Sequence, residues 1–199
     1  IHIVGEQDEK YHYRGYSIFH GLGAFGLSNG SFEAKNVYIE NASGCIAPSA
    51  FYGEDATVTV KNARLESCFY GIFSFMNHSW TIINNEIENS QNAITLLKQR
   101  PGSGGLVEGP DGISYVKGNR VQFNGALGLG VQNLKNIQIK DNNFEGSGRF
   151  GAIACAGVNG GDKWIIKENN LCDVIPVAPH DCTIYLDNLK NSEIKNNAN

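Results

Sequence analysis

The sequence is poor in charge and has no long apolar run. Charged residues make up 18% of its 199 residues, below the roughly 25% of an average soluble domain, and the net charge is −4. Phosphate contacts need a basic surface, and the chain shows no cluster of lysine or arginine, so we expect no nucleic-acid partner. No apolar stretch approaches the roughly 18 residues that cross a bilayer, so we expect no membrane span.

Short motifs that carry chemistry are also missing. The chain has no P-loop, GxSxG, HExxH or dinucleotide-binding fingerprint. Its five cysteines lack the CxxC or Cys/His spacing of a zinc site, so no metal ligands are assigned. Their odd number leaves at least one thiol unpaired, and we expect them mainly as small buried residues of a narrow core. Cys172 and Cys182 flank one loop and remain a candidate disulfide.

Glycine and asparagine are abundant, and the apolar residues suffice for a core. Glycine accounts for 24 residues and the set AVILMFWYC for 41% of the chain. This apolar content excludes disorder across the whole chain. Glycine and asparagine together favour many tight turns over long helices. The length predicts a single domain.

A pattern of eight residues recurs along the chain: apolar, any, apolar, any, polar, polar, any, apolar. Successive copies begin 22 to 34 residues apart, and a second short apolar motif follows most of them. The copies are FEAKNVYI (32–39), VTVKNARL (58–65), WTIINNEI (80–87), SYVKGNRV (114–121), IQIKDNNF (137–144), WIIKENNL (164–171) and a last start, SEIKNNAN (192–199).

Each repeat is typical of three short strands separated by polar turns. The first strand alternates with period two, as Ile137 and Ile139 do, and a pair such as Asn-Asn then bends the chain. One coil cannot bury its own inner face, but coils stacked at ~4.8 Å can. Asparagines at equivalent turns would then form a hydrogen-bonded ladder. The predicted apolar columns are Ile39, Leu65, Ile87, Val121, Phe144 and Leu171, and Ile46, Ile72, Ile94, Leu129, Ile153 and Ile184.

These repeats resemble the parallel β-helix repeats of the right-handed, pectin-lyase-like superfamily, over roughly residues 17–199. The resemblance implies an all-β, right-handed parallel β-helix of about seven coils with loop insertions. A leucine-rich repeat is the alternative, because IQIKDNNF also fits its consensus. That fold needs a helix or 3₁₀ segment between strands, whereas the intervening stretches here lack helical periodicity.

Both ends of the chain bear on its organisation. Residues 1–30 are assigned to a flanking or first-coil segment and residues 31–199 to the β-helix. The last repeat stops inside its pattern, and an open coil exposes backbone and core. We therefore expect a segment of a longer chain, with capping of the end by another element or subunit as the alternative.

Function in this superfamily usually lies in loops inserted between the strands, and the resemblance implies chemistry on acidic polysaccharides. The insertions at 97–113, 156–164 and 172–185 are the candidates. A lyase or epimerase must neutralise a uronate carboxylate and move a proton, so Lys98, Arg100, His180 and Asp181 are the predicted catalytic residues. Pro179, His180 and Asp181 are similar to the D-P-H-D/E motif of alginate C5-epimerases, although Ala178 replaces its first aspartate. Calcium is a candidate cofactor.

Phe73, Phe75 and Tyr185 are the predicted substrate-binding residues, because aromatic rings near the third strand can stack on sugars. The catalytic hypothesis is therefore a polysaccharide lyase or epimerase at a loop-lined groove. The alternative is a non-catalytic surface β-helix that acts as an adhesin, spacer or glycan-binding module. We expect a polysaccharide partner and a secreted, periplasmic or cell-surface location.

Overall fold

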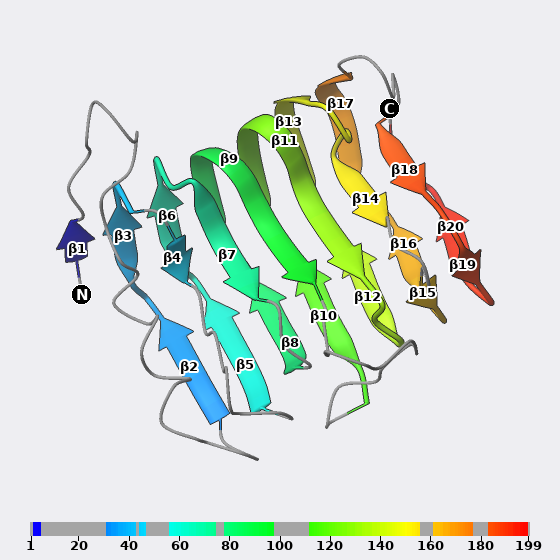
Figure 1. The fold of residues 1–199 in the computed structure, drawn as a ribbon, viewed down its shortest axis with the longest axis horizontal. Coiled ribbons are helices and arrows are strands. Elements are labelled where there is room, and N and C mark those ends of the chain that lie inside the picture. The colour runs from blue at the N-terminus through cyan, green and yellow to red at the C-terminus, as the bar shows by residue number, and fades with distance from the viewer. Residues whose placement is uncertain are drawn as a thin grey trace.

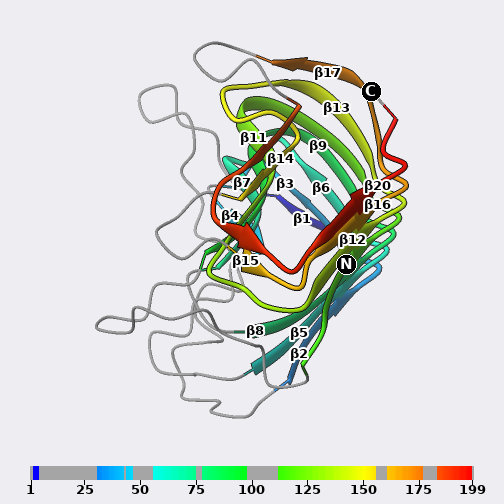
Figure 2. The same cartoon turned by 90° about the vertical axis from the view of Figure 1, so that its right-hand side faces the viewer.

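The chain forms a parallel β-solenoid without helices in the residues that the computed structural model describes. These are residues 2–4, 31–42, 44–46, 56–74, 78–97, 112–155, 161–176 and 183–198. Figure 1 shows the strands of successive coils side by side, and Figure 2, which looks along the stack, shows the coils superimposed around one interior. The leucine-rich repeat is excluded, since the described part of the coils continues from the first sheet into a second sheet where that fold would have a helix or 3₁₀ segment.

Each repeat contributes one strand to the first sheet, and neighbouring strands in this sheet are parallel. These strands stand at the start of each repeat, so they coincide with the first half of the eight-residue pattern. The strands are β2 (Ser31–Lys35), β5 (Ala56–Lys61), β8 (His78–Ile83), β10 (Ser114–Lys117), β12 (Ile137–Lys140), β16 (Ile165–Lys167) and β20 (Glu193–Lys195).

The second sheet forms the rest of the coil and bends partway along its strands. Its first part contains β1 (His2–Val4), β3 (Tyr38–Glu40), β6 (Arg64–Glu66), β13 (Asn143–Gly148) and β17 (Asn170–Pro176). Its second part contains β4 (Gly44–Ile46), β7 (Tyr70–Ser74), β14 (Ile153–Cys155) and β18 (Ile184–Leu186), and the long β9 (Glu86–Leu97) and β11 (Arg120–Gln132) cross both parts. A short pair, β15 (Gly161–Asp162) and β19 (Leu189–Lys190), stands apart.

The solenoid makes about five turns rather than the seven predicted. The sequence count took each of the seven starts of a repeat as a full coil. The predicted columns are confirmed. Ile39 pairs with Leu65 and Leu65 with Ile87 in register, and all three are nearly inaccessible to water. The second column runs in the same way from Ile46 to Ile153, and Ile184 continues it half-buried.

The predicted asparagine ladder occupies the turn that leads from the first sheet to the second. In every rung but the last, the side-chain Nδ2 donates to Oδ1 of the next rung at 2.8–2.9 Å, and in all five it also donates to a backbone carbonyl of a neighbouring coil. The residue before each rung has a positive φ, which suits Asn, Asp or Gly. The turn amides of a buried bend are thus satisfied by stacked side chains. The rungs are Asn85, Asn119, Asn142, Asn169 and Asn197.

Two cysteines that the sequence placed only in the core are in fact joined. Cys45 and Cys68 are fully buried and form a disulfide between adjacent coils, with 6.0 Å between their Cα atoms. Closing a loop of this length stabilises a fold by about 3 kcal/mol. Cys172, considered above as a partner of Cys182, is a free and exposed thiol. Cys155 is free and buried, and burial raises the pKa of its thiol to about 12.

Candidate functional site

Most of the predicted site residues lie outside the described part of the chain. These are Lys98, Arg100, Phe75, His180 and Asp181. Their predicted roles therefore stay predictions. The described strands do fix where the insertions begin: residues 98–111 follow β9 and residues 156–160 follow β14. Leu96 of β9 and Cys155 of β14 both lie opposite Val131 of β11, so these two insertions start at the same edge of the sheet.

The two predicted aromatic residues in the described part share one row but do not meet. Phe73 is opposite Thr95, and the row continues through Gly130 and Ala154 to Tyr185. Four strand spacings separate the two aromatic residues, or about 19 Å. Both side chains are half-buried. A single sugar ring cannot contact both.

Phe73 belongs to a local aromatic cluster. Its ring centroid lies 4.4 Å from that of Tyr70, which meets Phe69 edge to face at 4.7 Å. Burial raises the pKa of Tyr70 above its ordinary value. The Phe73 ring thus packs against Tyr70, and its role in substrate binding stays a prediction.

A row of lysines, which we call the lysine row, crosses the outer face of the first sheet. Each of its members is the last residue of its strand and points away from the core, because the preceding residue points inward. At the strand spacing of ~4.8 Å, the whole row spans about 29 Å. In register, the row reads Lys35, Lys61, Ile83, Lys117, Lys140, Lys167 and Lys195, with one isoleucine among six lysines.

Acidic partners reach four of these lysines, and they come from the same strand, from the following turn or from the turn of the neighbouring coil. Glu33 lies 2.6 Å from Lys35 in β2, and Glu193 pairs with Lys195 in β20. That pairing lowers the pKa of Glu193, mainly through the hydrogen bond from Lys195.

Two more lysines have looser acidic neighbours. Lys117 lies 3.6 Å from Asp141, and Lys167 lies 3.7 Å from Glu168. The remaining two, Lys61 and Lys140, have no carboxylate within 4.0 Å among the described residues.

The lysine row was missed in the sequence although its signal is present there. Lysine occupies the fourth position of six of the seven copies of the repeat. Its members are far apart along the chain, so a search for a local basic run does not find them. The statement that the chain lacks a lysine cluster is therefore corrected by the strand register, which brings the six side chains into one line.

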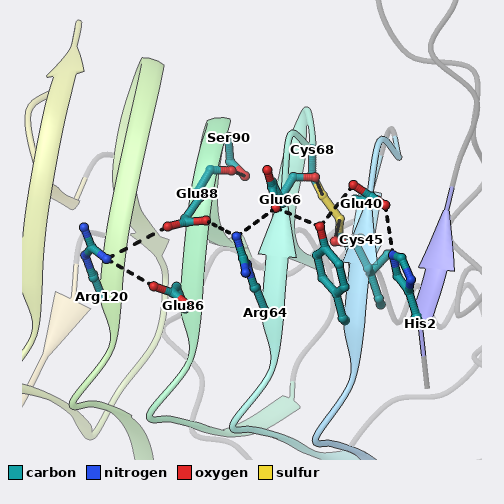
Figure 3. A network of polar contacts seen from close by, with 12 residues as sticks. His2, Glu40, Cys45, Arg64, Glu66, Cys68, Glu86, Glu88, Ser90 and Arg120 are labelled. Atoms are coloured by element: carbon teal, nitrogen blue, oxygen red, sulfur yellow. Dashed lines mark hydrogen bonds and ion pairs between the residues drawn. A yellow bond between two sulfur atoms is a disulfide. The ribbon is translucent and has the colours of Figure 1, made fainter.

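The second sheet carries a different charged surface on its first part, which we call the charged ladder (Figure 3). Two outward rows form it, and in both of them charged residues from neighbouring strands lie opposite one another. One row is His2, Tyr38, Arg64, Glu86 and Arg120, and the other is Glu40, Glu66 and Glu88.

Opposite charges meet both within and across the strands of the charged ladder. Arg64 Nη2 lies 3.2 Å from Glu66 Oε2 and 3.1 Å from Glu88 Oε2, and Glu88 is the main cause that raises the pKa of the guanidinium. Arg120 Nη1 lies 3.1 Å from Glu86 Oε1. These side chains are partly exposed, so each pair contributes only weakly to the stability of the fold.

Tyr38 is held between two carboxylates at the N-terminal end of the charged ladder. Its hydroxyl lies 2.8 Å from Glu66 Oε2 and 3.1 Å from Glu40 Oε2, and the hydrogen bond to Glu66 is the main cause that raises its pKa to about 12. The His2 ring stacks on Tyr38 at 4.3 Å, and its Nε2 lies 2.9 Å from Glu40. Tyr38 is therefore a poor base near neutral pH, and the network is arranged to hold coils together.

No group of three or more His, Cys, Asp or Glu side chains in the described part is placed to hold a metal ion. Calcium binding thus stays a prediction. Nor does any helix within the described ranges have the length and hydropathy of a membrane span.

Comparison of the chain with models of protein families, with curated proteins and with solved structures found no match. The fold is a parallel β-solenoid, and the membership of a particular superfamily remains the resemblance described above.

Proposed function

We propose that this chain is a binding module for an acidic polysaccharide, which it holds along the lysine row. The observation that supports the proposal is the register of six lysines on one flat outer face. Their pitch follows the strand spacing, which is close to the length of one sugar residue in an extended glycan. A linear polyanion lying across the strands would therefore meet a cation at nearly every coil. Such a module would act outside the cell or at its surface.

The uneven neutralisation of the row also supports this proposal. Ion pairs with neighbouring acids partly neutralise four of the lysines, whereas Lys61 and Lys140 have no such ion pair among the described residues. Stacked like charges are unfavourable to folding, so packing alone gives no reason for the row. A ligand that carries negative charge removes this repulsion when it binds, and its affinity should fall steeply with salt.

The lysine row is a poor fit to nucleic acid. Its lysines follow one line of register across parallel strands, whereas a duplex presents its phosphates along a helical path, and no aromatic residue lies in the row to stack on bases. The net charge of −4 also opposes long-range attraction of a densely charged duplex. We therefore favour a polysaccharide with about one charge per residue.

The test is the binding of polygalacturonate to the full chain by titration calorimetry at several salt concentrations. The variant Lys61→Gln/Lys140→Gln should bind about tenfold more weakly, because two exposed ion pairs of about 0.7 kcal/mol each are lost. The matched control is Lys135→Gln/Lys190→Gln, which removes the same charge outside the row.

An equal loss in both variants would show a general charge effect and contradict the proposal. Tighter binding of duplex DNA than of polygalacturonate would contradict it as well. The catalytic hypothesis is tested in the same samples, since a lyase that uses Lys98, Arg100, His180 and Asp181 would produce unsaturated chain ends that absorb ultraviolet light.

A further inference from the structure

A shallow cleft of about 340 Å³ opens on the same outer face as the lysine row, near the beginning of the strands β12, β16 and β20. Two parallel rows line it. Gln138, Ile165 and Glu193 form one row across the three strands. The other row precedes the strands and contains Ile113, Asn136, Lys163 and Asn191.

The lysine row lies two residues farther along each of these strands. Lys140 follows Gln138, Lys167 follows Ile165, and Lys195 follows Glu193 on the outward side. Two residues of β-strand span about 7 Å. A polymer on the lysine row therefore passes close enough for one of its residues, or a short branch, to enter the cleft.

Lys163 is the unusual residue of the cleft. Its φ is 56°, in the left-handed region, where the equivalent turns use Asn136 at 52° and Asn191 at 47°. Lysine lacks the short polar side chain that makes this conformation easy for asparagine, so the position is unfavourable by about 1 kcal/mol. Strain of this kind is often kept where a side chain has a function. Within the described ranges, no carboxylate lies within 4.0 Å of the Lys163 ammonium group, and the residue is exposed.

The other lining groups offer the contacts that a sugar ring needs. The amides of Asn136, Gln138 and Asn191 carry both donors and acceptors for hydroxyl groups. Asn191 Nδ2 already donates to Asp162 Oδ1 at 2.8 Å, which fixes that amide. Ile165, half-buried, and Ile113, 40% exposed, provide apolar surface for the C–H face of a ring.

Glu193 limits which anions fit. Its carboxylate pairs with Lys195, so it is held as a hydrogen-bond acceptor at the end of the cleft opposite Ile113. A small inorganic anion gains nothing from an acceptor or from isoleucines. A ring that bears both hydroxyl groups and a single negative group uses all the lining groups.

We propose that this cleft is a binding subsite for one carboxylated sugar residue, with Lys163 as its carboxylate partner. This inference rests on the proposed function, since it assigns most of the affinity for the polymer to the lysine row and the selectivity for the sugar residue to the cleft. Lys163 contacts the carboxylate, the three amides and Glu193 contact hydroxyl groups, and the isoleucines contact the ring.

The test uses the full chain and a trisaccharide of galacturonic acid, too short to cover the lysine row, with binding followed by NMR shift changes. Lys163→Asn installs the residue of the equivalent turns, so it should fold at least as well as the natural chain. We expect it to bind the trisaccharide at least fivefold more weakly. Lys190→Asn is the control with the same charge change and should bind as the natural chain does. The neutral galactose trisaccharide should bind weakly to all three proteins.

Unchanged binding of the galacturonate trisaccharide by Lys163→Asn would overturn the inference, and so would equal binding of the neutral trisaccharide by the natural chain. The two proposals fail separately. Loss of long-polymer binding in Lys61→Gln/Lys140→Gln concerns the lysine row. Loss of trisaccharide binding in Lys163→Asn, with the salt dependence for the polymer nearly kept, concerns the cleft.

Discussion

The two charged faces of the solenoid use the same strand spacing in opposite ways. In the lysine row, four of the six neighbouring pairs consist of two lysines, as with Lys140 between Lys117 and Lys167. In the charged ladder, Arg64 and Arg120 lie beside glutamates of the neighbouring strands. Register in a parallel stack repeats whatever each coil carries at that position. Charges then stabilise the stack only where neighbouring coils differ in sign.

This contrast separates a structural surface from a candidate ligand surface. In the charged ladder, Arg64 and Arg120 pair with glutamates of neighbouring coils and offset the like charges of the row Glu40, Glu66 and Glu88, so its role is explained by coil stacking. The lysine row is neutralised only in part, because four of its six lysines have an acidic partner and only Lys117 has one from a neighbouring coil. Repulsion between the lysines therefore remains until something else removes it. Natural proteins often keep such unfavourable surfaces where function needs them.

The largest expected effect concerns the asparagine turn that joins the two faces. Asn142→Ala removes two hydrogen bonds donated by its Nδ2, to Val116 O and Asn169 Oδ1, and two accepted by its Oδ1 from Asn119. At about 1 kcal/mol for each bond, we expect the free energy of unfolding to fall by about 4 kcal/mol. Denaturant unfolding measures this, and Asn143→Ala, on the adjacent half-buried residue, is the control. Equal losses in the two variants would show that stacking inside the turn is unimportant.

The next effect tests the charged ladder. Arg120→Glu replaces a cation that lies 3.1 Å from Glu86 and 3.9 Å from Glu88 and Glu145 with a like charge. We expect a loss of about 1.5 kcal/mol in the free energy of unfolding. The control is Arg149→Glu, whose guanidinium contacts only the Phe150 ring at 5.5 Å among its described partners. If both reversals cost the same, pairing across strands does not explain this face.

On the lysine row, reversal of a charge is expected to raise the free energy of unfolding rather than lower it. Lys140→Glu places a carboxylate between Lys117 and Lys167, so it should raise the free energy of unfolding by about 0.5 kcal/mol while it weakens polygalacturonate binding. The stabilisation should shrink in 1 M salt, where the Debye screening length is about 3 Å. A destabilised variant would mean that the lysines are not in mutual repulsion, and the contrast between the two faces would be lost.

The smallest effect is the alkaline titration of Tyr38. Its pKa is raised from 10.0 to about 12 in the folded chain, so the neutral form is favoured there. The stability it contributes is full below pH 10 and is lost as the pH rises through 12. Ultraviolet absorbance of tyrosinate, compared between the natural chain and Tyr38→Phe, reports the titration. Glu66→Gln should move it back toward the ordinary value, and an unmoved titration would show that Glu66 is not the cause.

Particular residues show how far sequence reasoning reached. Ile39, Leu65 and Ile87 were assigned to one column because apolar positions that repeat at matched offsets must share one face. The Cys45–Cys68 disulfide was not found, because pairing depends on the distance between two Cβ atoms in different coils. Tyr38 was missed for the same reason, since its carboxylate partners Glu40 and Glu66 come from two neighbouring strands.

The amino-acid sequence by itself determined the solenoid, its inward columns and its asparagine turns, since periodic burial and turn chemistry are local and repeat with the chain. Only the tertiary structure decided which charges became neighbours, where the cleft opens and which cysteines pair. Those relations depend on the lateral register of strands that are 22 to 34 residues apart in sequence, and the register follows from packing the whole stack.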